Sequence, residues 1–97
     1  MVIPTYVAFL EQVNTAFQVP LPAPYETIEI SLQEANERED EMFSSFTLLF
    51  QGPVSVQLEQ GTYALSHPTL GEVFLFLVPV MRTPQGFQYE AVINRYK

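Results

Sequence analysis

The sequence predicts a mainly β (α+β) protein: a small six-stranded antiparallel sheet or partly closed barrel with one short N-terminal helix. Residues 72–80 read Glu-Val-Phe-Leu-Phe-Leu-Val-Pro-Val, which is rich in β-branched and aromatic residues and flanked by turn residues. Apolar residues fall on both faces of this segment, so we expect a central strand that is covered on both faces. The predicted connections are mostly short, and short connections imply antiparallel pairing because parallel crossovers need about a dozen residues or more.

The N-terminal residues 4–13 predict a single amphipathic helix. Apolar residues repeat at helical spacing along one face: Tyr6, Phe9, Leu10 and Val13. Pro4 suits a first helical turn, where its missing N–H costs nothing, and Asn14 is expected to end the helix. A helix this short is marginal alone, so we expect its aromatic face to dock on the sheet.

The next part of the chain predicts two strands separated by prolines. Residues 15–20 are uncharged and predict a first strand, and residues 21–25 (Leu-Pro-Ala-Pro-Tyr) predict a bend. Residues 26–33 alternate apolar and polar side chains, as a half-exposed antiparallel strand does. The acidic residues 34–41 are expected to form a charged loop or the frayed end of that strand.

Four further segments complete the predicted sheet. Residues 45–51 predict a strand that bends at the following Gly-Pro, and residues 54–58 predict a short extended continuation of it. Residues 61–67 alternate and are expected to form a hairpin with the central strand through the turn His-Pro-Thr-Leu-Gly. The last strand covers residues 87–94, with Phe87, Tyr89, Ala91 and Ile93 on one side.

The composition narrows the class of protein. Ninety-seven residues, 47% of them hydrophobic, predict a single domain over residues 1–97. The net charge of -7 argues against nucleic acid and anionic membranes as partners, since both are bound through clustered Lys and Arg. The longest uncharged apolar run, residues 73–81, is too short to cross a bilayer. No basic signal-peptide region is present, so we expect a cytoplasmic protein or one assembled into a larger particle.

No motif predicts a catalytic, cofactor-binding or metal-binding residue. The chain has no cysteine and one histidine, His67, which would need a nucleophile such as Ser66 or Ser45 to act as a general base. A histidine that stabilises its turn by bonding backbone carbonyls is the simpler interpretation. The sequence also lacks a nucleophile-elbow motif and a glycine-rich phosphate loop.

Carboxylates and aromatic residues are the remaining candidates for a site. The acidic run of Glu37, Glu39, Asp40 and Glu41 lacks the ligand spacing of a calcium loop, and a solvated cluster that keeps an edge from pairing is expected instead. Paired carboxylates for acid–base chemistry would have to come from Glu26, Glu29, Glu72 or Glu90. Glu90 shares a face with Val92, so we expect it to be partly covered. The aromatic side chains are expected in the core, although a barrel cavity could also be lined by Tyr25, Tyr63, Tyr89, Phe74 and Phe76.

Four segments carry a resemblance to a known family. They are residues 43–53 (FSSFTLLFQGP), residues 60–71 (QGTYALSHPTLG), residues 75–80 (LFLVPV) and residues 89–94 (YEAVIN). Together they resemble a bacterial family of about this length that is known as a domain of unknown function, and the resemblance covers roughly residues 3–94. It implies no catalytic residue. Because genes of the family often lie beside those of proteins with phage-tail-collar-type fibre domains, it implies an accessory of a fibre or tail.

The sequence therefore predicts a non-enzymatic protein-interaction or assembly module. The expected partner is another protein, of the fibre or tail-collar type, or a second copy of the chain. Because an exposed strand edge readily accepts another strand, we expect the partner at the uncharged first strand and the proline-rich bend, at Phe17, Val19, Leu21 and Tyr25. The second hypothesis is a small-ligand-binding β-barrel that uses its interior. No enzyme activity is expected.

Overall fold

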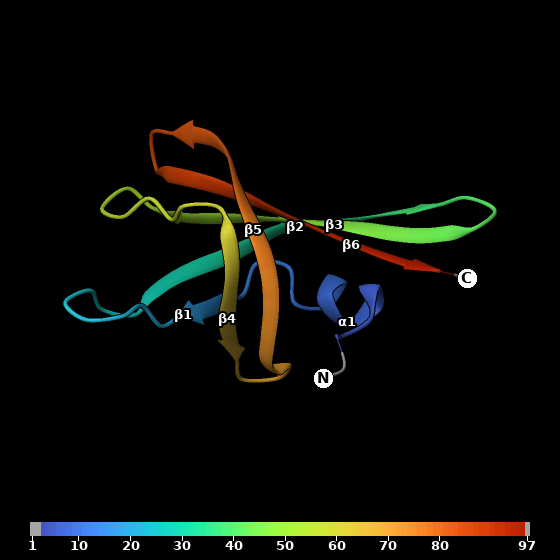
Figure 1. Cartoon of the computed structure of the whole chain (residues 1–97), viewed down its shortest axis with the longest axis horizontal. Coiled ribbons are helices and arrows are strands. Elements are labelled where there is room, and N and C mark those ends of the chain that lie inside the picture. The colour runs from blue at the N-terminus through green and yellow to red at the C-terminus, as the bar shows by residue number, and fades with distance from the viewer. Residues whose placement is uncertain (1–2, 97) are drawn as a thin grey trace.

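The computed structural model describes residues 3–96, which form one helix and six strands. The elements are α1 (Tyr6–Leu10), β1 (Ala16–Val19), β2 (Ile28–Glu39), β3 (Phe43–Pro53), β4 (Gly61–His67), β5 (Gly71–Thr83) and β6 (Gly86–Tyr96). All neighbouring strands are antiparallel, and they close in a ring in the order β1-β2-β3-β6-β5-β4 (Figure 1). The predicted fold, a six-stranded antiparallel sheet with one short N-terminal helix, is confirmed.

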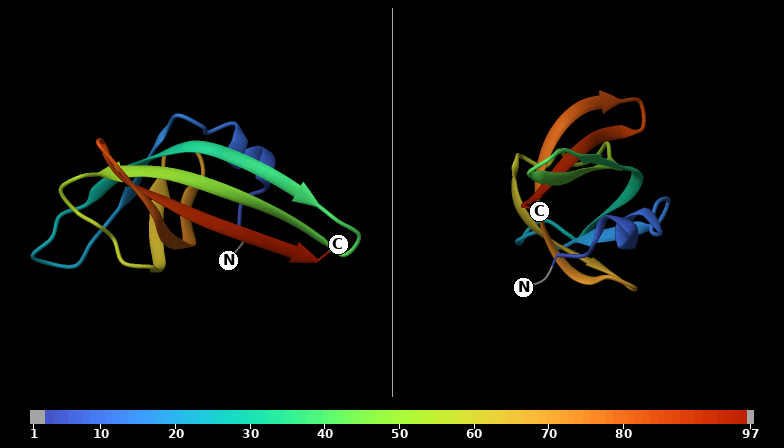
Figure 2. Two further views of the ribbon diagram at one scale, coloured as in Figure 1. Left: turned by 90° about the horizontal axis from the view of Figure 1, so that it is seen from above. Right: turned by 90° about the vertical axis from the view of Figure 1, so that its right-hand side faces the viewer.

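The ring closes weakly at one position. Between β1 and β4 a single pair, Gln18 opposite Ser66, joins the strands, whereas the other neighbours are joined by ladders of several pairs. The sheet therefore curls round on itself without the full hydrogen bonding of a true barrel, as the end-on view in Figure 2 shows.

Two meanders make up this ring. Strands β1, β2 and β3 follow one another along the chain and in the sheet, and so do β4, β5 and β6. The loop of residues 54–60 connects the two meanders. Their main contact is the ladder between β3 and β6, which runs from Phe43 opposite Tyr96 to Pro53 opposite Gly86 and contains 11 residue pairs.

Part of the sheet projects beyond the ring. Residues 33–39 of β2, 43–48 of β3 and 91–96 of β6 form a three-stranded extension, the arm, at the right of Figure 1. The ring of Phe46 in β3 lies 5.8 Å from the rings of both Tyr6 and Phe9, so α1 packs on the inner face of the arm. Within the described residues, no helix is long or apolar enough to cross a membrane.

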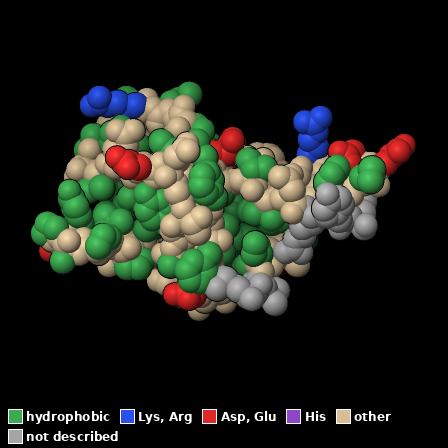
Figure 3. Space-filling view, viewed as in Figure 1, with side chains coloured by type: hydrophobic (Ala, Val, Ile, Leu, Met, Phe, Trp, Pro, Cys, Tyr) green, Lys and Arg blue, Asp and Glu red, His purple; other side chains and the backbone are tan. Residues whose placement is uncertain are grey.

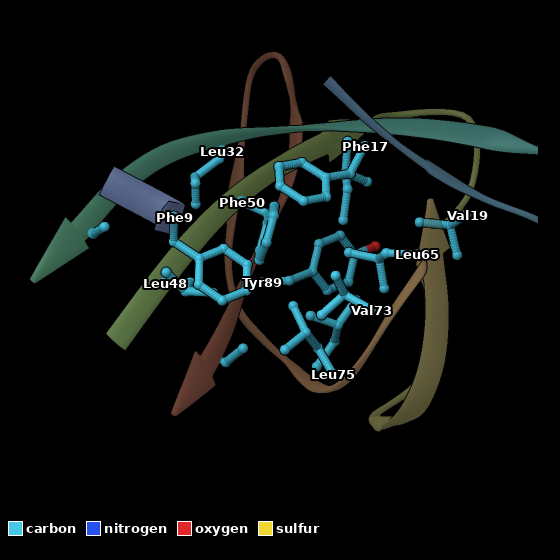
Figure 4. Packing of buried hydrophobic residues seen from close by; sticks show 14 of the residues in the cluster. Phe9, Phe17, Val19, Leu32, Leu48, Phe50, Leu65, Val73, Leu75 and Tyr89 are labelled. Carbon is cyan, nitrogen blue, oxygen red and sulfur yellow. The ribbon is translucent and has the colours of Figure 1, made fainter. Parts of the chain in front are cut away.

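Inward side chains fill the space that the strands enclose. Phe17, Phe50 and Tyr89 are fully buried, and Figure 4 shows them pointing toward one another from three strands. The rings of Phe17 and Phe50 meet edge to face at 5.3 Å, an arrangement that aromatic pairs favour. Alternating apolar residues on every strand therefore supply one shared core.

The N-terminal helix is shorter than predicted. It covers Tyr6–Leu10, and turns rather than helix occupy residues 11–14. Thr5 caps its N-terminus by accepting a hydrogen bond from the Ala8 N–H at 3.1 Å, so Pro4 precedes the cap instead of lying in the first turn. The predicted end at Asn14 is wrong, because the helix ends at Leu10 with Glu11 as its C-cap. Asn14, which has a positive φ of 72°, instead ends the turns that follow.

Two segments differ from their predicted structure. Residues 34–39 were expected in a loop or a frayed end, but they continue β2 and pair with β3 as far as Glu39 opposite Ser44. Residues 54–58 were expected to extend the preceding strand, but β3 ends at Pro53 and a turn and loop follow. The physical reason is that one buried side chain, Leu58, anchors this loop without any ladder hydrogen bonds.

Candidate interaction surfaces

The central strand β5 exposes one of its faces. Val73, Leu75 and Leu77 point into the core, but Phe74 is 38% exposed and Phe76 is 52% exposed. The prediction that this strand is covered on both faces is therefore wrong. A ring of one sheet has only one interior, and no second layer of the described chain packs on the outer face.

The exposed side chains of β5 continue onto its neighbours. The outer apolar face consists of outward residues of three adjacent strands: Phe74, Phe76, Val78 and Met81 of β5, Val92 of β6 and Leu49 of β3. Figure 3 looks onto β4 and β5 and shows hydrophobic side chains gathered along this side. Exposed apolar patches of this kind mark interaction sites.

One carboxylate lies within the outer apolar face. Glu90 of β6 is opposite Val78 of β5 and opposite Leu49 of β3. Its side chain is half-buried, which confirms the expectation that it is partly covered. No basic side chain of residues 3–94 forms an ion pair with it. The other carboxylates considered for acid–base chemistry, Glu26, Glu29 and Glu72, are exposed.

The predicted partner-binding residues are divided between the core and the surface. Phe17 and Val19 are 0% exposed, because β1 pairs with β2 and faces the interior. Leu21 is half-buried and Tyr25 is 62% exposed, in the loop between β1 and β2. The structure therefore leaves Leu21 and Tyr25 available to a partner, but not the two side chains of β1.

A groove lies beside this exposed loop. Leu21, Pro22 and Tyr25 face residues 55–59 of the loop that connects the two meanders, and Tyr63 of β4 completes the lining. Tyr25 also borders a second open groove against Pro53 and Ser55. Both grooves lie on the surface of the molecule rather than in the interior of the ring.

His67 has a structural role at the seam of the ring. Its Nδ1 accepts hydrogen bonds from the backbone N–H groups of Thr69 (3.0 Å) and Leu70 (3.2 Å). Nε2 therefore carries the proton and donates it to Thr15 Oγ1 at 2.8 Å, whose hydroxyl donates to the Gln12 carbonyl at 2.6 Å. Burial lowers the pKa of His67 below its ordinary value of 6.5, so the neutral form is favoured.

The expected turn-stabilising role of His67 is thus confirmed, with one correction. The ring bonds backbone N–H groups rather than carbonyls, because its unprotonated Nδ1 can only accept. Ser66 is exposed on the opposite face of β4, and the Ser45 hydroxyl in the arm donates to the Arg38 carbonyl at 3.4 Å. The structure does not bring a serine and the histidine together as a nucleophile and its base.

The acidic run forms part of the arm. Asp40 Oδ1 accepts hydrogen bonds from the N–H groups of Met42 (3.0 Å) and Phe43 (2.8 Å), which shapes the turn between β2 and β3. Within residues 3–96, no three histidine or carboxylate side chains lie close enough together to hold a metal ion.

A family model matches most of the chain. The model is described as Domain of unknown function (DUF6916), and it matches residues 4–93. The chain belongs to this family. The resemblance of its four segments to a domain of unknown function is thereby confirmed. No curated protein and no solved structure matches the DUF6916 chain.

The four segments of the DUF6916 chain that carry the resemblance lie in four of the six strands of the ring. Residues 43–53 are β3, residues 60–71 include β4 with its histidine turn, and the other two segments belong to β5 and β6. They contain both core residues such as Phe50 and members of the outer apolar face such as Phe76. Sequence reasoning missed this face, although its signal, apolar residues at alternate positions 74, 76 and 78, was visible.

Proposed function

We propose that this protein is a non-enzymatic interaction module that docks on a partner protein through its outer apolar face. The observation that carries the proposal is the exposure of two aromatic side chains in the middle of the sheet, Phe74 and Phe76. Aromatic rings that face solvent on a strand gain little in the isolated protein. Aromatic residues and methionine are enriched in the cores of protein interfaces.

The area beside these rings supports the same proposal. Val92 is 52% exposed and Met81 is 60% exposed, so apolar surface extends from β5 across to β6. Charged residues are sparse within the face, where Glu90 stands among apolar neighbours. Depletion of charge at the centre of an apolar patch is the compositional signal of an interface.

The finer form of the proposal is an accessory of a fibre of the phage-tail-collar type. Its support is the family resemblance, and the mainly β architecture is compatible with addition to another β-rich protein. Self-association remains the second kind of partner, with a second copy of the chain on the same face.

The second hypothesis, a small ligand held inside the ring, has less support. Large side chains occupy the interior, among them the fully buried Phe17, Phe50 and Tyr89. A ligand site needs a cavity with a few converging polar groups, whereas the two grooves beside Tyr25 are open at the surface.

The test is affinity capture from the native host with the tagged protein and with two variants. The double variant Phe74→Ser/Phe76→Ser alters the outer apolar face. Met42→Ser removes a still more exposed apolar side chain away from that face, at the tip of the arm, where Met42 is 64% exposed. We expect a stoichiometric protein to be retained by the wild type and by Met42→Ser, and to be lost with the double variant. Retention by all three proteins would refute docking through this face.

Substitutions of the two predicted partner-binding residues of β1, such as Phe17→Asp or Val19→Asp, are unsuitable as tests of binding. Both would place a charge in the core, which costs far more than a hydrogen-bonded surface change. Tyr25→Asp is the appropriate variant for the surface loop, because its side chain is exposed. It reports whether this loop adds to binding.

A further inference from the structure

We propose that the partner contributes a basic, extended segment that adds as a strand to the free edge of β6, beside the outer apolar face. This inference rests on the proposed function, because it states how the partner is bound. It is carried by three features of the structure: an unpaired strand edge, the absence of charge at residues 91–94 of that edge, and the position of Glu90.

The edge of β6 becomes free where β5 turns away from it. The ladder between these strands runs from Thr83 opposite Gly86 to Val78 opposite Glu90. Beyond Val78, β5 pairs only with β4, whereas β6 continues into the arm with β3 on its other side. Figure 1 shows the two strands diverging. Within residues 3–96, no strand pairs with this edge of β6 at residues 91–94.

The edge on the opposite side of the arm is protected. Four charged residues lie along β2 in the arm: Glu34, Glu37, Arg38 and Glu39. The N-terminal segment also occupies part of that edge, because the Asn14 N–H donates to the Leu32 carbonyl at 2.7 Å and the Tyr6 hydroxyl donates to the Ala35 carbonyl at 3.3 Å. Charges and covering segments are the usual means by which proteins prevent a strand edge from pairing.

The β6 edge has no such protection. Residues 91–94 read Ala-Val-Ile-Asn, which contains no charge and two β-branched residues that favour strand pairing. In the three-stranded arm the edge of β2 is protected and the edge of β6 at residues 91–94 is not, so β6 provides the edge that can accept a strand.

The outer apolar face supplies the side-chain contacts for such a strand. Val78 is opposite Glu90, so Phe76 and Val92 would be the next pair on the outer face if the ladder between β5 and β6 continued. A strand added to β6 takes the place that β5 vacates, and its outward side chains then lie between Phe76 and Val92. Each of these two residues is 52% exposed, so a strand with apolar residues at alternate positions would cover both.

The charge of the partner follows from Glu90. This half-buried carboxylate stands at the point of divergence, between Val78 and Leu49, with no basic partner among residues 3–94. A Lys or Arg on the incoming strand would pair with it as the strand covers its apolar neighbours. The net charge of -7 also attracts a basic segment over a longer range.

A second copy of the chain fits this edge less well. Two copies each carry a net charge of -7, with eleven acidic and four basic residues, and so repel one another on approach. The proposal therefore commits to a different protein with a basic, apolar strand.

The probe is a set of short synthetic peptides with Val or Phe at alternate positions. In one peptide the intervening positions carry Lys, in the second Glu, and in the third Ser. A fourth peptide repeats the Lys sequence with N-methyl groups at alternate residues, which removes backbone donors while keeping the charge. Binding to the full chain is measured by titration calorimetry, and the amide protons of residues 91–94 are followed by hydrogen exchange.

We expect the Lys peptide to bind at least about tenfold more tightly than the Glu peptide, and to slow exchange of the amides that it pairs with in residues 91–94. The N-methylated peptide should not bind in the register that points its methylated nitrogens toward β6, because those nitrogens can no longer donate hydrogen bonds to that strand. Glu90→Gln should remove most of the preference for Lys over Glu, while the Ser peptide binds this variant and the wild type equally well. Equal affinity for all peptides, or no change in exchange at residues 91–94, would overturn the inference.

Two outcomes separate this inference from the proposed function. If the captured partner is lost with Phe74→Ser/Phe76→Ser and yet no peptide protects residues 91–94, the outer face binds a partner but strand addition is wrong. If sedimentation shows that the chain alone forms a dimer, and hydrogen exchange shows that residues 91–94 are protected in that dimer, the second copy replaces the basic partner as the occupant of the edge.

Discussion

The hydroxyl of Tyr89 holds the loop between the two meanders to the core. Its oxygen accepts a hydrogen bond from the Leu58 N–H at 2.8 Å, and both residues are buried, with Tyr89 at 0% and Leu58 at 4% exposure. Tyr89→Phe keeps the ring and removes only this acceptor. The Leu58 N–H then stays in the core without a partner, since the loop cannot bring it to water without also exposing the Leu58 side chain.

The expected cost is that of a buried, unsatisfied donor, about 1–3 kcal/mol. A domain of this size has a total stability of roughly 5–15 kcal/mol, so the loss is large enough to measure. With a urea m-value of roughly 1–3 kcal/mol/M, a loss of this size lowers the midpoint of unfolding by about 1 M. Equilibrium urea unfolding gives the free energy, and hydrogen exchange of the Leu58 amide gives the local effect.

A matched control lies at the end of the same loop. The Tyr63 hydroxyl donates to the Glu59 carbonyl at 2.6 Å, but this bond is exposed to solvent. Tyr63→Phe should therefore cost no more than about 0.5 kcal/mol, because water replaces the lost donor. If Tyr89→Phe costs as little as this control, and the Leu58 amide stays as protected as before, the proposed anchoring of the loop is refuted.

Three further predictions follow from burial, titration and backbone conformation. Leu75→Ala should destabilise the protein by about 2–5 kcal/mol in urea unfolding, since Leu75 is 3% exposed, whereas Phe76→Ala should cost less than about 1 kcal/mol because Phe76 faces solvent; equal losses would contradict the one-sided burial of β5. Burial lowers the pKa of His67 in the folded state, so the unfolded chain binds this proton at higher pH than the folded chain does. The free energy of unfolding should therefore be constant above about pH 6.5 and fall below it, and His67→Gln should remove this fall. Urea midpoints of the wild type that do not change on acidification to about pH 5.5 would refute the prediction. Gly86→Ala should cost more than about 2 kcal/mol, because Gly86 has a φ of 145° and an added Cβ would overlap the Gly52 carbonyl oxygen; a melting temperature equal to that of the wild type would disprove this.

Alternation of apolar and polar residues was enough to predict most strands of this fold. β4 covers Gly61–His67 as expected, and the turn after it is held by the histidine. Short connections then led to antiparallel neighbours, which the ring confirms. These features are local, so a single sequence contains the information that specifies them.

The features that were wrongly predicted depend on distant parts of the chain. Residues 34–39 are charged on both faces, and only the ladder with β3 makes them a strand. Phe74 and Phe76 look like core residues by composition, but which face of a strand is covered depends on the number of layers in the fold. Phe17 looks like part of an exposed edge, but closure of the ring places it in the interior.

The candidate site was harder to predict than the fold for the same reason. The outer apolar face combines three strands whose order, β3-β6-β5, does not follow the chain. Glu90 gains its significance from Val78 and Leu49, which oppose it from two different strands. Its partial burial could be expected from the alternation with Val92, but its neighbours could not.

The division into two meanders has a consequence for the covalent chain. The connecting loop begins at an exposed turn, where Val54 is 59% exposed, and a protease that cuts there severs no strand. One fragment would retain β1, β2 and β3, and the other would retain Leu58 with its Tyr89 anchor and the remaining strands. We expect the fragments to stay associated through the ladder of 11 pairs and to reassemble after separation. The two meanders would then behave as the two subunits of a heterodimer, which in the intact protein are joined by the loop.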